Sequence, residues 1–358
     1  MPSVHLPPWI ARQAAELLAR PGHAWLLQGP SGLGQFELAL ALAAAWLCDA
    51  PTPQGACGQC PGCHSLHVHT HADFVMLMPE THMLERGWPL PEKAQAEIDE
   101  KKRKPSKEIR VDAMREAIEF AQRTSARGRG KAMLIYPAER MNAVTANALL
   151  KTLEEPPGDM RFVLATEAAH LLLPTIRSRC LTHTLRWPDA AEALPWLAAC
   201  GVHEAAAAAL LQAAGGCPAA ALQLARSAES QAEARTTARK AKPAFDDGQQ
   251  AAAAWARLPK ALAQGDASAL ASLPTAEIVA RLQKLCADLM AAQTGAPPRF
   301  FAAADLPARP LPLPALAKWW GQLAQAARSA EHPLNAGLTL EYLASSARQA
   351  LNSVKATN

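Results

Sequence analysis

Residues 131–166 read KAMLIYPAERMNAVTANALLKTLEEPPGDMRFVLAT, and this stretch decides the fold. A helical pattern over residues 142–155 lies between two short apolar runs, and its apolar residues recur at the spacing of one helix face. Asn142 is a suitable N-cap, and residues 156–158 (PPG) stop the helix because proline cannot donate a backbone hydrogen bond. Strand, helix and strand with short connections predict a βαβ unit of a parallel sheet. Thr166 would stand at the carboxyl end of a strand, where such sheets bind ligands.

Three motifs in and after this stretch resemble those of a known family. They are NALLKTLEEPP (residues 147–157), FVLAT (residues 162–166) and LPTIRSRC (residues 173–180). In this order they are similar to the AAA+ subunits of the bacterial DNA polymerase III clamp loader, a more specific match than a lone glycine pattern. The resemblance implies an α/β P-loop-type core with a parallel five-stranded sheet, then a small helical lid and an all-α collar. The sequence offers apolar runs for five strands, near residues 24, 74, 133, 163 and 182.

The length of 358 residues predicts two or three domains. We expect the AAA+ core in residues 1–187, carrying a four-cysteine module (residues 48–63) and an insertion (residues 80–107). A helical lid would follow in residues 188–236. Residues 237–358 would form the C-terminal helical collar, which joins subunits in this family.

Composition limits the class of protein. The formal net charge is only +4, so no global basic signal demands nucleic acid. The sequence has neither a signal-peptide pattern nor an apolar run long enough for a membrane span. Four of the eight cysteines cluster within sixteen residues, which is typical of a metal site rather than of a disulfide framework. These features predict a cytoplasmic protein.

The clustered cysteines have the spacing of zinc ligands. Two Cys-x2-Cys steps share a cysteine, and the fourth comes from the end of the preceding expected helix; the set is Cys48, Cys57, Cys60 and Cys63. Four thiolates make a closed tetrahedral structural Zn²⁺ site. The alternative is four reduced thiols. The histidines that follow are expected to be loop residues rather than ligands; they are His64, His67, His69 and His71.

The loop at residues 29–34 (GPSGLG) has the frame of a phosphate-binding P-loop between a strand and a helix. Gly29 and Gly34 fit the pattern. However, Gln35 stands where a lysine should reach the phosphates, and Phe36 stands where a hydroxyl should ligate magnesium. The loop then serves only to connect strand and helix, and whether a nucleotide binds there inertly is left open.

Two other nucleotide elements of the family are also missing. The central strand ends in Tyr136 and Pro137 instead of the expected acids, and the nearest carboxylate, Glu139, is displaced from the strand end. In the lid, Ala219 replaces the arginine that the family places on the γ-phosphate. These losses imply that the chain itself lacks ATPase activity, and we expect no polymerase activity from it either.

The Ser-Arg-Cys triplet at residues 178–180 is intact. In this family the arginine of the triplet acts in trans, as a finger on ATP bound by the adjacent subunit. The resemblance therefore assigns Arg179 as the finger and Arg177 as a supporting ion-pair residue. The alternative is that both arginines simply pair with acidic groups nearby.

Three further expectations concern single segments. The basic run at residues 101–104 (KKRK) suggests DNA phosphates, but a solvated face balanced by nearby acids is favoured because no aromatic residues interleave. The helical pattern of residues 109–123 has Asp112 as a plausible cap. Trp319 and Trp320 are expected in a core or a subunit interface.

The whole pattern resembles a catalytically degenerate member of the clamp loader. Its implied partners are the delta and gamma/tau subunits, with the sliding clamp and primed DNA reached through the complex. The chain would be a static, non-hydrolysing subunit. The alternatives are an active gamma/tau-type ATPase and a zinc-dependent nucleic-acid-binding module.

Overall fold

The computed structural model describes residues 6–226, 247–330 and 335–353. The chain divides into two units, Met1–Trp187 and Pro188–Asn358. Each unit has a buried core of its own. The expected separation of a lid from a collar within the second unit stays a prediction.

The first unit is built on a five-stranded sheet in the order β2-β3-β4-β1-β5. All four strand pairs are parallel, which confirms the predicted sheet. The interior strands are almost entirely buried and therefore consist mainly of apolar residues. The strands are β1 (Ala24–Gln28), β2 (Phe74–Leu77), β3 (Lys131–Ile135), β4 (Met160–Thr166) and β5 (Leu181–Thr184).

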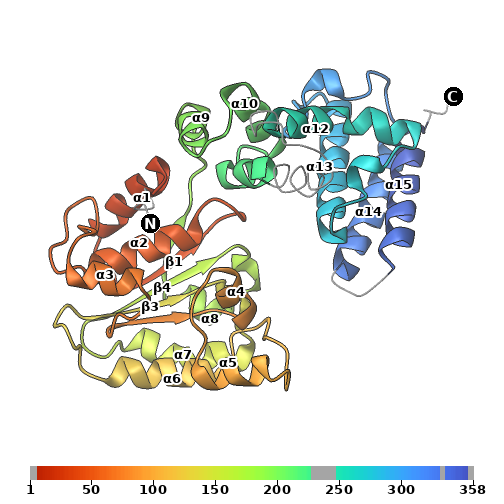
Figure 1. The fold of residues 1–358 in the computed structure, drawn as a ribbon. Helices are drawn as coiled ribbons and strands as arrows, with labels where there is room; N and C mark the ends of the chain where they lie inside the picture. Colours follow the sequence, from red (N-terminus) through yellow and green to blue (C-terminus); the bar gives the residue numbers. More distant parts are fainter. Residues whose placement is uncertain (1–5, 227–246, 331–334, 354–358) are drawn as a thin grey trace, which may run out of the picture. The chain divides into compact units, whose positions relative to one another are not determined.

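Helices cover both faces of this sheet. Figure 1 shows α1 and α2 on one face and α6 and α7 on the other. This α/β arrangement agrees with the fold class expected from the sequence. The helices of the unit are α1 (Pro8–Leu18), α2 (Gln35–Leu47), α3 (Pro61–His67), α4 (Glu80–Glu85), α5 (Glu92–Asp99), α6 (Val111–Gln122), α7 (Ala143–Glu154) and α8 (Pro174–Arg177), with short 3-10 turns η1 (Ala138–Arg140) and η2 (Ala169–Leu171).

The ends of these helices test the predicted caps. Asn142 caps α7 as expected, because its side chain accepts a hydrogen bond of 2.9 Å from the backbone N–H of Thr145. The prediction for α6 was wrong. The residue that precedes that helix is Arg110, no side chain caps it, and Asp112 lies inside the first turn, where it forms an ion pair with Arg115.

The second unit is helical throughout its described residues. Its first helices pack on one another around a small apolar cluster, and the later helices share a larger one. Trp319 lies in that larger core, whereas Trp320 is 40% exposed. The helices are α9 (Ala190–Ala199), α10 (Glu204–Ala213), the helix Pro218–Arg226, α12 (Asp247–Gln264), α13 (Thr275–Gln293), α14 (Leu313–Ser329) and α15 (Ala336–Leu351), with 3-10 turns η3 (Ser268–Leu270) and η4 (Ala303–Asp305).

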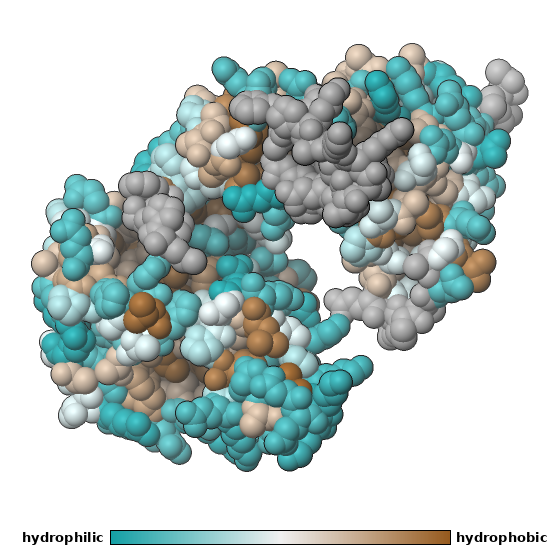
Figure 2. Space-filling view, viewed as in Figure 1, coloured by the Kyte–Doolittle hydropathy of each residue, from teal (hydrophilic) through white to brown (hydrophobic). Residues whose placement is uncertain are grey.

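Across residues 6–226, 247–330 and 335–353, no single helix is long and apolar enough to cross a membrane. One bent pair, Glu204–Ala213 with Pro218–Arg226, passes that test by length and composition. Many residues of this pair are buried in the core of the second unit. Figure 2 shows hydrophobic side chains only in small groups among hydrophilic ones on the visible face.

Candidate functional site

The side chain of Gln35, the first residue of α2, closes the loop between β1 and α2. Gln35, which is 2% exposed, donates from Nε2 to the carbonyl oxygens of Gly29 and Pro30, at 2.5 and 2.7 Å. Gly34 adopts a φ of 100°, and a Cβ there would lie 2.8 Å from a carbon of Ile10, so glycine is required. The amide therefore ties the loop to itself and supplies no positive charge for a phosphate.

A cluster of aromatic rings and a guanidinium lies beside this loop. Phe36 is buried, and its ring centroid is 5.3 Å from that of Tyr136 at the end of β3. The guanidinium carbon of Arg86 lies 4.1 Å from the centroid of the Phe36 ring and 5.1 Å from that of Tyr136. Tyr136 donates its hydroxyl to Glu167 at 3.0 Å, and burial, with Glu167, raises the pKa of Tyr136. Sequence reasoning missed Arg86, because nothing in the local pattern links it to Phe36.

Two further polar groups at this edge of the sheet, Thr166 and Glu139, bind each other. Thr166 is fully buried at the end of β4, as predicted, and donates its hydroxyl to Glu139 at 2.6 Å. Glu139 lies on η1, beyond the end of β3, and also accepts the backbone N–H of Glu167 at 3.1 Å. This carboxylate is thus held against β4, and its oxygens are occupied by protein donors.

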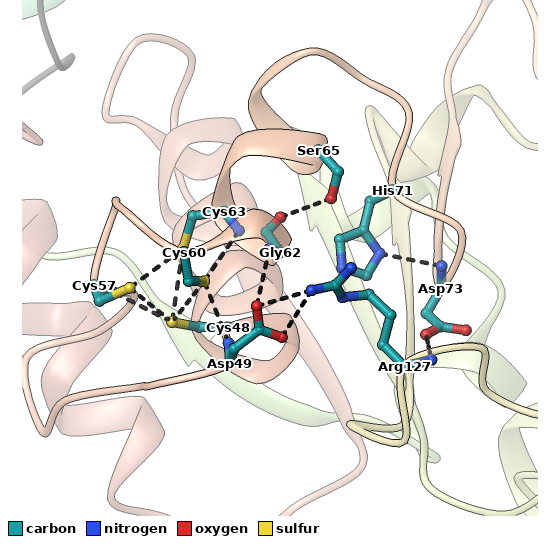
Figure 3. A network of polar contacts seen from close by, with 10 residues as sticks. All are labelled: Cys48, Asp49, Cys57, Cys60, Gly62, Cys63, Ser65, His71, Asp73 and Arg127. Carbon is teal, nitrogen blue, oxygen red and sulfur yellow. Dashed lines mark hydrogen bonds and ion pairs between the residues drawn. The ribbon is translucent and has the colours of Figure 1, made fainter.

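The four predicted cysteines come together between the end of α2 and α3. Their sulfurs all lie within 4.8 Å of one another, and Figure 3 shows them converging. Four of the sulfur–sulfur distances are 3.4, 3.8, 4.0 and 3.6 Å. A tetrahedral zinc with bonds of about 2.3 Å would hold its sulfurs about 3.8 Å apart, so this cluster fits such an ion. The cluster can bind a metal ion.

Backbone N–H groups already favour thiolates in this cluster. Cys57 N–H donates to the sulfur of Cys48 at 3.3 Å, and Cys63 N–H donates to the sulfur of Cys60 at 3.3 Å. Hydrogen bonds from the backbone of Gln59 and Cys60 lower the pKa of Cys57 to about 6. Burial raises the pKa of Cys48 and Cys63. Binding of a cation would offset that burial, because a metal favours the deprotonated thiol.

The cysteine module is tied to a distant turn by one ion pair. Asp49, next to Cys48, accepts the backbone N–H of Gly62 at 3.1 Å and forms an ion pair with Arg127 at 2.8 Å (Figure 3). The N–H of Gly62 and the guanidinium of Arg127 lower the pKa of Asp49. Asp73, the residue before β2, also holds this turn in place. Its carboxylate accepts the backbone N–H groups of residues 126 and 127 at 2.7 and 2.8 Å.

The nearby histidines do not join the sulfur cluster, but the prediction that all four are loop residues was wrong for His64 and His67, which lie on α3. His71 is buried and accepts the backbone N–H of Asp73 at 3.1 Å. His69 stacks on Trp88 with ring centroids 3.7 Å apart. The candidate metal site found in the described part of the chain consists of the four cysteines alone.

The two arginines near the end of α8 differ in their surroundings. Arg179 donates to the carbonyl oxygen of Thr175 at 2.9 Å and pairs with Glu154 at the end of α7, leaving its side chain 30% exposed. Arg177 is exposed, and no salt bridge is found for it among residues 6–226, 247–330 and 335–353. The expected ion pair of Arg177 is therefore wrong, and it is Arg179 that has one.

Two of the four basic residues in the run at residues 101–104 are paired with acids. Arg103 pairs with Glu80 at 2.5 Å and with Glu97 at 2.7 Å, and Lys102 pairs with Glu100 at 2.5 Å. The preceding helix, α5 (Glu92–Asp99), ends before this run begins. These pairs support the interpretation of the run as a solvated face rather than a DNA contact.

Comparison with known proteins places the first unit in a family. The model of the family described as "DNA polymerase III, delta subunit" matches residues 13–189. DNA polymerase III subunit delta' of Pseudomonas aeruginosa is 41% identical over 180 residues, 50% of this chain and 48% of that protein. The subunit delta' of Escherichia coli K12 is 34% identical over 195 residues, 53% of this chain and 52% of that protein. The match therefore spans about half the length of these relatives.

More distant similarities extend to other subunits. DNA polymerase III subunit tau of Salmonella typhimurium is 32% identical over 172 residues, 48% of this chain and 23% of that protein. A solved structure of a DNA polymerase III gamma subunit-related protein from Thermotoga maritima has a TM-score of 0.47 and 17% identity, covering 96% of this chain and 99% of that one. From the family model and the delta' relatives, residues 13–189 of this chain belong to the family of DNA polymerase III delta' subunits.

Proposed function

We propose that the chain is a non-hydrolysing stator subunit of the DNA polymerase III clamp loader, working in the cytoplasm. It would assemble with the delta and gamma/tau subunits through a C-terminal collar. Through that complex it would help to load the sliding clamp on primed DNA. Arg179 would act in trans on ATP bound by a neighbouring gamma/tau subunit.

The closed loop between β1 and α2 carries the non-hydrolysing part of this proposal. Gln35 uses its amide to bond the carbonyl groups of the loop and brings no positive charge to the position of the family's lysine. Phe36, Tyr136 and Arg86 fill the neighbouring space with rings and a guanidinium, where catalysis needs a magnesium ligand and acids. Glu139 is committed to Thr166 and to a backbone N–H.

The position of Arg179 supports its proposed role in trans. It lies just after the short helix α8, between β4 and β5, and its side chain remains partly exposed. A guanidinium is planar, permanently charged and bidentate, which suits charge that develops on a transferred phosphoryl group. The pair with Glu154 would hold the side chain extended until a neighbour's phosphate competes for it. Exposed pairs of this kind are weak, so the exchange costs little.

The metal in the cysteine cluster is proposed to be a structural Zn²⁺. Four sulfur ligands close the coordination shell, which leaves no open position for catalysis. The ion would stabilise a loop that has little apolar core of its own.

The test is ATP hydrolysis and clamp loading by the reconstituted complex, with this chain carrying Arg179→Ala. We expect stimulated hydrolysis at the neighbouring site to fall at least about a hundredfold, given the effect of such fingers in small GTPases. Arg177→Ala is the matched control, and Glu154→Gln, which removes the competing partner, should retain activity. Size-exclusion chromatography checks that all variants assemble. Unchanged hydrolysis in an assembled Arg179→Ala complex would refute the finger.

A further inference from the structure

A groove lies at the amino ends of β1 and β4, at the opposite edge of the sheet from the closed loop. Its volume is about 790 Å³. One wall is Pro51, Thr52 and Pro53 of the cysteine module, and the other is Gly128 and Arg129 of the turn before β3. Neither the finger nor the nucleotide loop takes part in it.

The groove is lined by unneutralised positive charge. Three exposed arginines face it, Arg20, Arg129 and Arg161, together with a single acid, Asp159. Within residues 6–226, 247–330 and 335–353, none of the three arginines forms a salt bridge. The guanidinium carbon of Arg161 lies 5.5 Å from the ring centroid of Trp46, and both residues line the groove. The local charge is therefore strongly positive although the whole chain is near balance.

The two walls are joined through the polar network of Figure 3. Arg127, in the same turn as Arg129, pairs with Asp49 of the cysteine module at 2.8 Å. Asp73 holds the backbone of that turn at residues 126 and 127. The ion pair of Arg127 with Asp49 thus places Arg129 opposite Pro51–Pro53, and the two charges of that pair neutralise each other. The cysteine module thereby fixes the shape of the groove.

The three arginines of the lining favour a ligand that carries phosphate groups. Guanidinium groups bind phosphates through paired hydrogen bonds. The groove lies at the ends of the interior strands β1 and β4, so it offers no unpaired strand edge on which an extended peptide could pair. Trp25 and Trp46 are 2% and 9% exposed, so bases would find no stacking platform. Recognition would rest on the backbone phosphates.

We propose that this groove binds the phosphodiester backbone of single-stranded nucleic acid through Arg20, Arg129 and Arg161. Binding through these three arginines is independent of base sequence, because phosphate contacts carry no sequence information. It requires neither ATP nor a neighbouring subunit, so it is a property of the isolated chain. Failure of this proposal would leave the proposed stator role and Arg179 untouched.

Fluorescence anisotropy of a labelled oligothymidine of about ten nucleotides tests the groove with the full-length, zinc-loaded chain. Three phosphate contacts predict a plot of log affinity against log salt with a slope of about −2. Replacing any of the three arginines by glutamine should weaken binding severalfold and reduce that slope by about 0.7. Asp159→Asn should strengthen binding, because it removes the one negative charge of the lining.

Arg115→Gln is the matched control, since this exposed arginine lies on α6, paired with Asp112 and outside the groove. It should bind like the wild type. Asp49→Asn should weaken binding without removing a lining charge, because it releases the turn. Circular dichroism and thermal melting verify that each variant folds. The proposal is overturned if the oligonucleotide does not bind at low salt, if Arg115→Gln weakens binding as much as Arg161→Gln, or if polyglutamate binds through the same arginines in its place.

Discussion

At the scale of the residue, Glu80 shows how one buried carboxylate organises the insertion. Its side chain accepts two hydrogen bonds from Arg103 and one of 2.7 Å from the backbone N–H of Ser106. Burial acts to raise the pKa of Glu80, but Arg103 and the N–H of Ser106 outweigh it and leave that pKa below its ordinary value. The first residue of α4 is thereby tied to the far end of the insertion.

This lowered pKa predicts an acid-dependent stability. A depressed folded-state pKa stabilises the native state above the unfolded-state pKa of about 4.3, and the contribution is lost as pH falls through the folded value. We expect Glu80→Gln to cost about 2 kcal/mol at neutral pH and to flatten the decline of stability below about pH 4. Urea denaturation between pH 7 and 3 measures both effects. Glu92→Gln, an exposed acid of α5, should change neither; equal pH profiles for wild type and Glu80→Gln would contradict the assignment.

Residues whose roles are local were predictable, and those with distant partners were not. Asn142 caps α7 through residues next to it in the chain, and the four cysteines lie within one short loop. Arg86 on Phe36, Arg127 on Asp49 and Arg179 on Glu154 are pairs brought together by the tertiary fold. No periodicity or spacing signals such pairs. The sequence therefore indicated the cysteine cluster and the loss of the P-loop lysine, but not the contacts that replace that lysine.

At the scale of the element, the strand–loop–helix unit of β1 and α2 keeps the frame of a P-loop while its contacts are rebuilt. Its boundaries follow from apolar runs and a required glycine, so they were predictable within a residue or two. Its surroundings depend on the side chains of Arg86 and Tyr136, which follow α4 and β3 in the chain. Restoring the motif alone should therefore not restore the function.

The double variant Gln35→Lys, Phe36→Thr tests this expectation. It supplies the lysine and hydroxyl of an active loop, but Tyr136 still follows β3, and Glu139 is still bound to Thr166. Without acids to hold magnesium and orient water, we expect no ATP hydrolysis above background. A fluorescent ATP analogue and a phosphate-release assay measure binding and turnover. Hydrolysis by the double variant at the rate of an active subunit would mean that only these two residues keep the chain inactive.

At the scale of the whole molecule, the chain divides into two units with separate cores, and the part that the structure describes holds one candidate metal cluster. The four cysteines of the cluster lie in Met1–Trp187, and their network reaches Asp73, just before β2, and the turn before β3. The helices of Pro188–Asn358 bury their own apolar residues. A change at the cluster should therefore be felt in the stability of one unit only.

Thermal unfolding of the full chain tests this separation. We expect two transitions, and removal of zinc with a chelator should lower one midpoint by at least about 5 °C, because metal binding contributes directly to folding of the unit that holds it. Cys57→Ser should shift the same transition in the same direction. Cys200→Ser is the matched control, since that half-buried cysteine lies at the end of α9 in the second unit. A single transition, or an equal shift of both on chelation, would mean that the two cores unfold together and that the cluster stabilises the molecule as a whole.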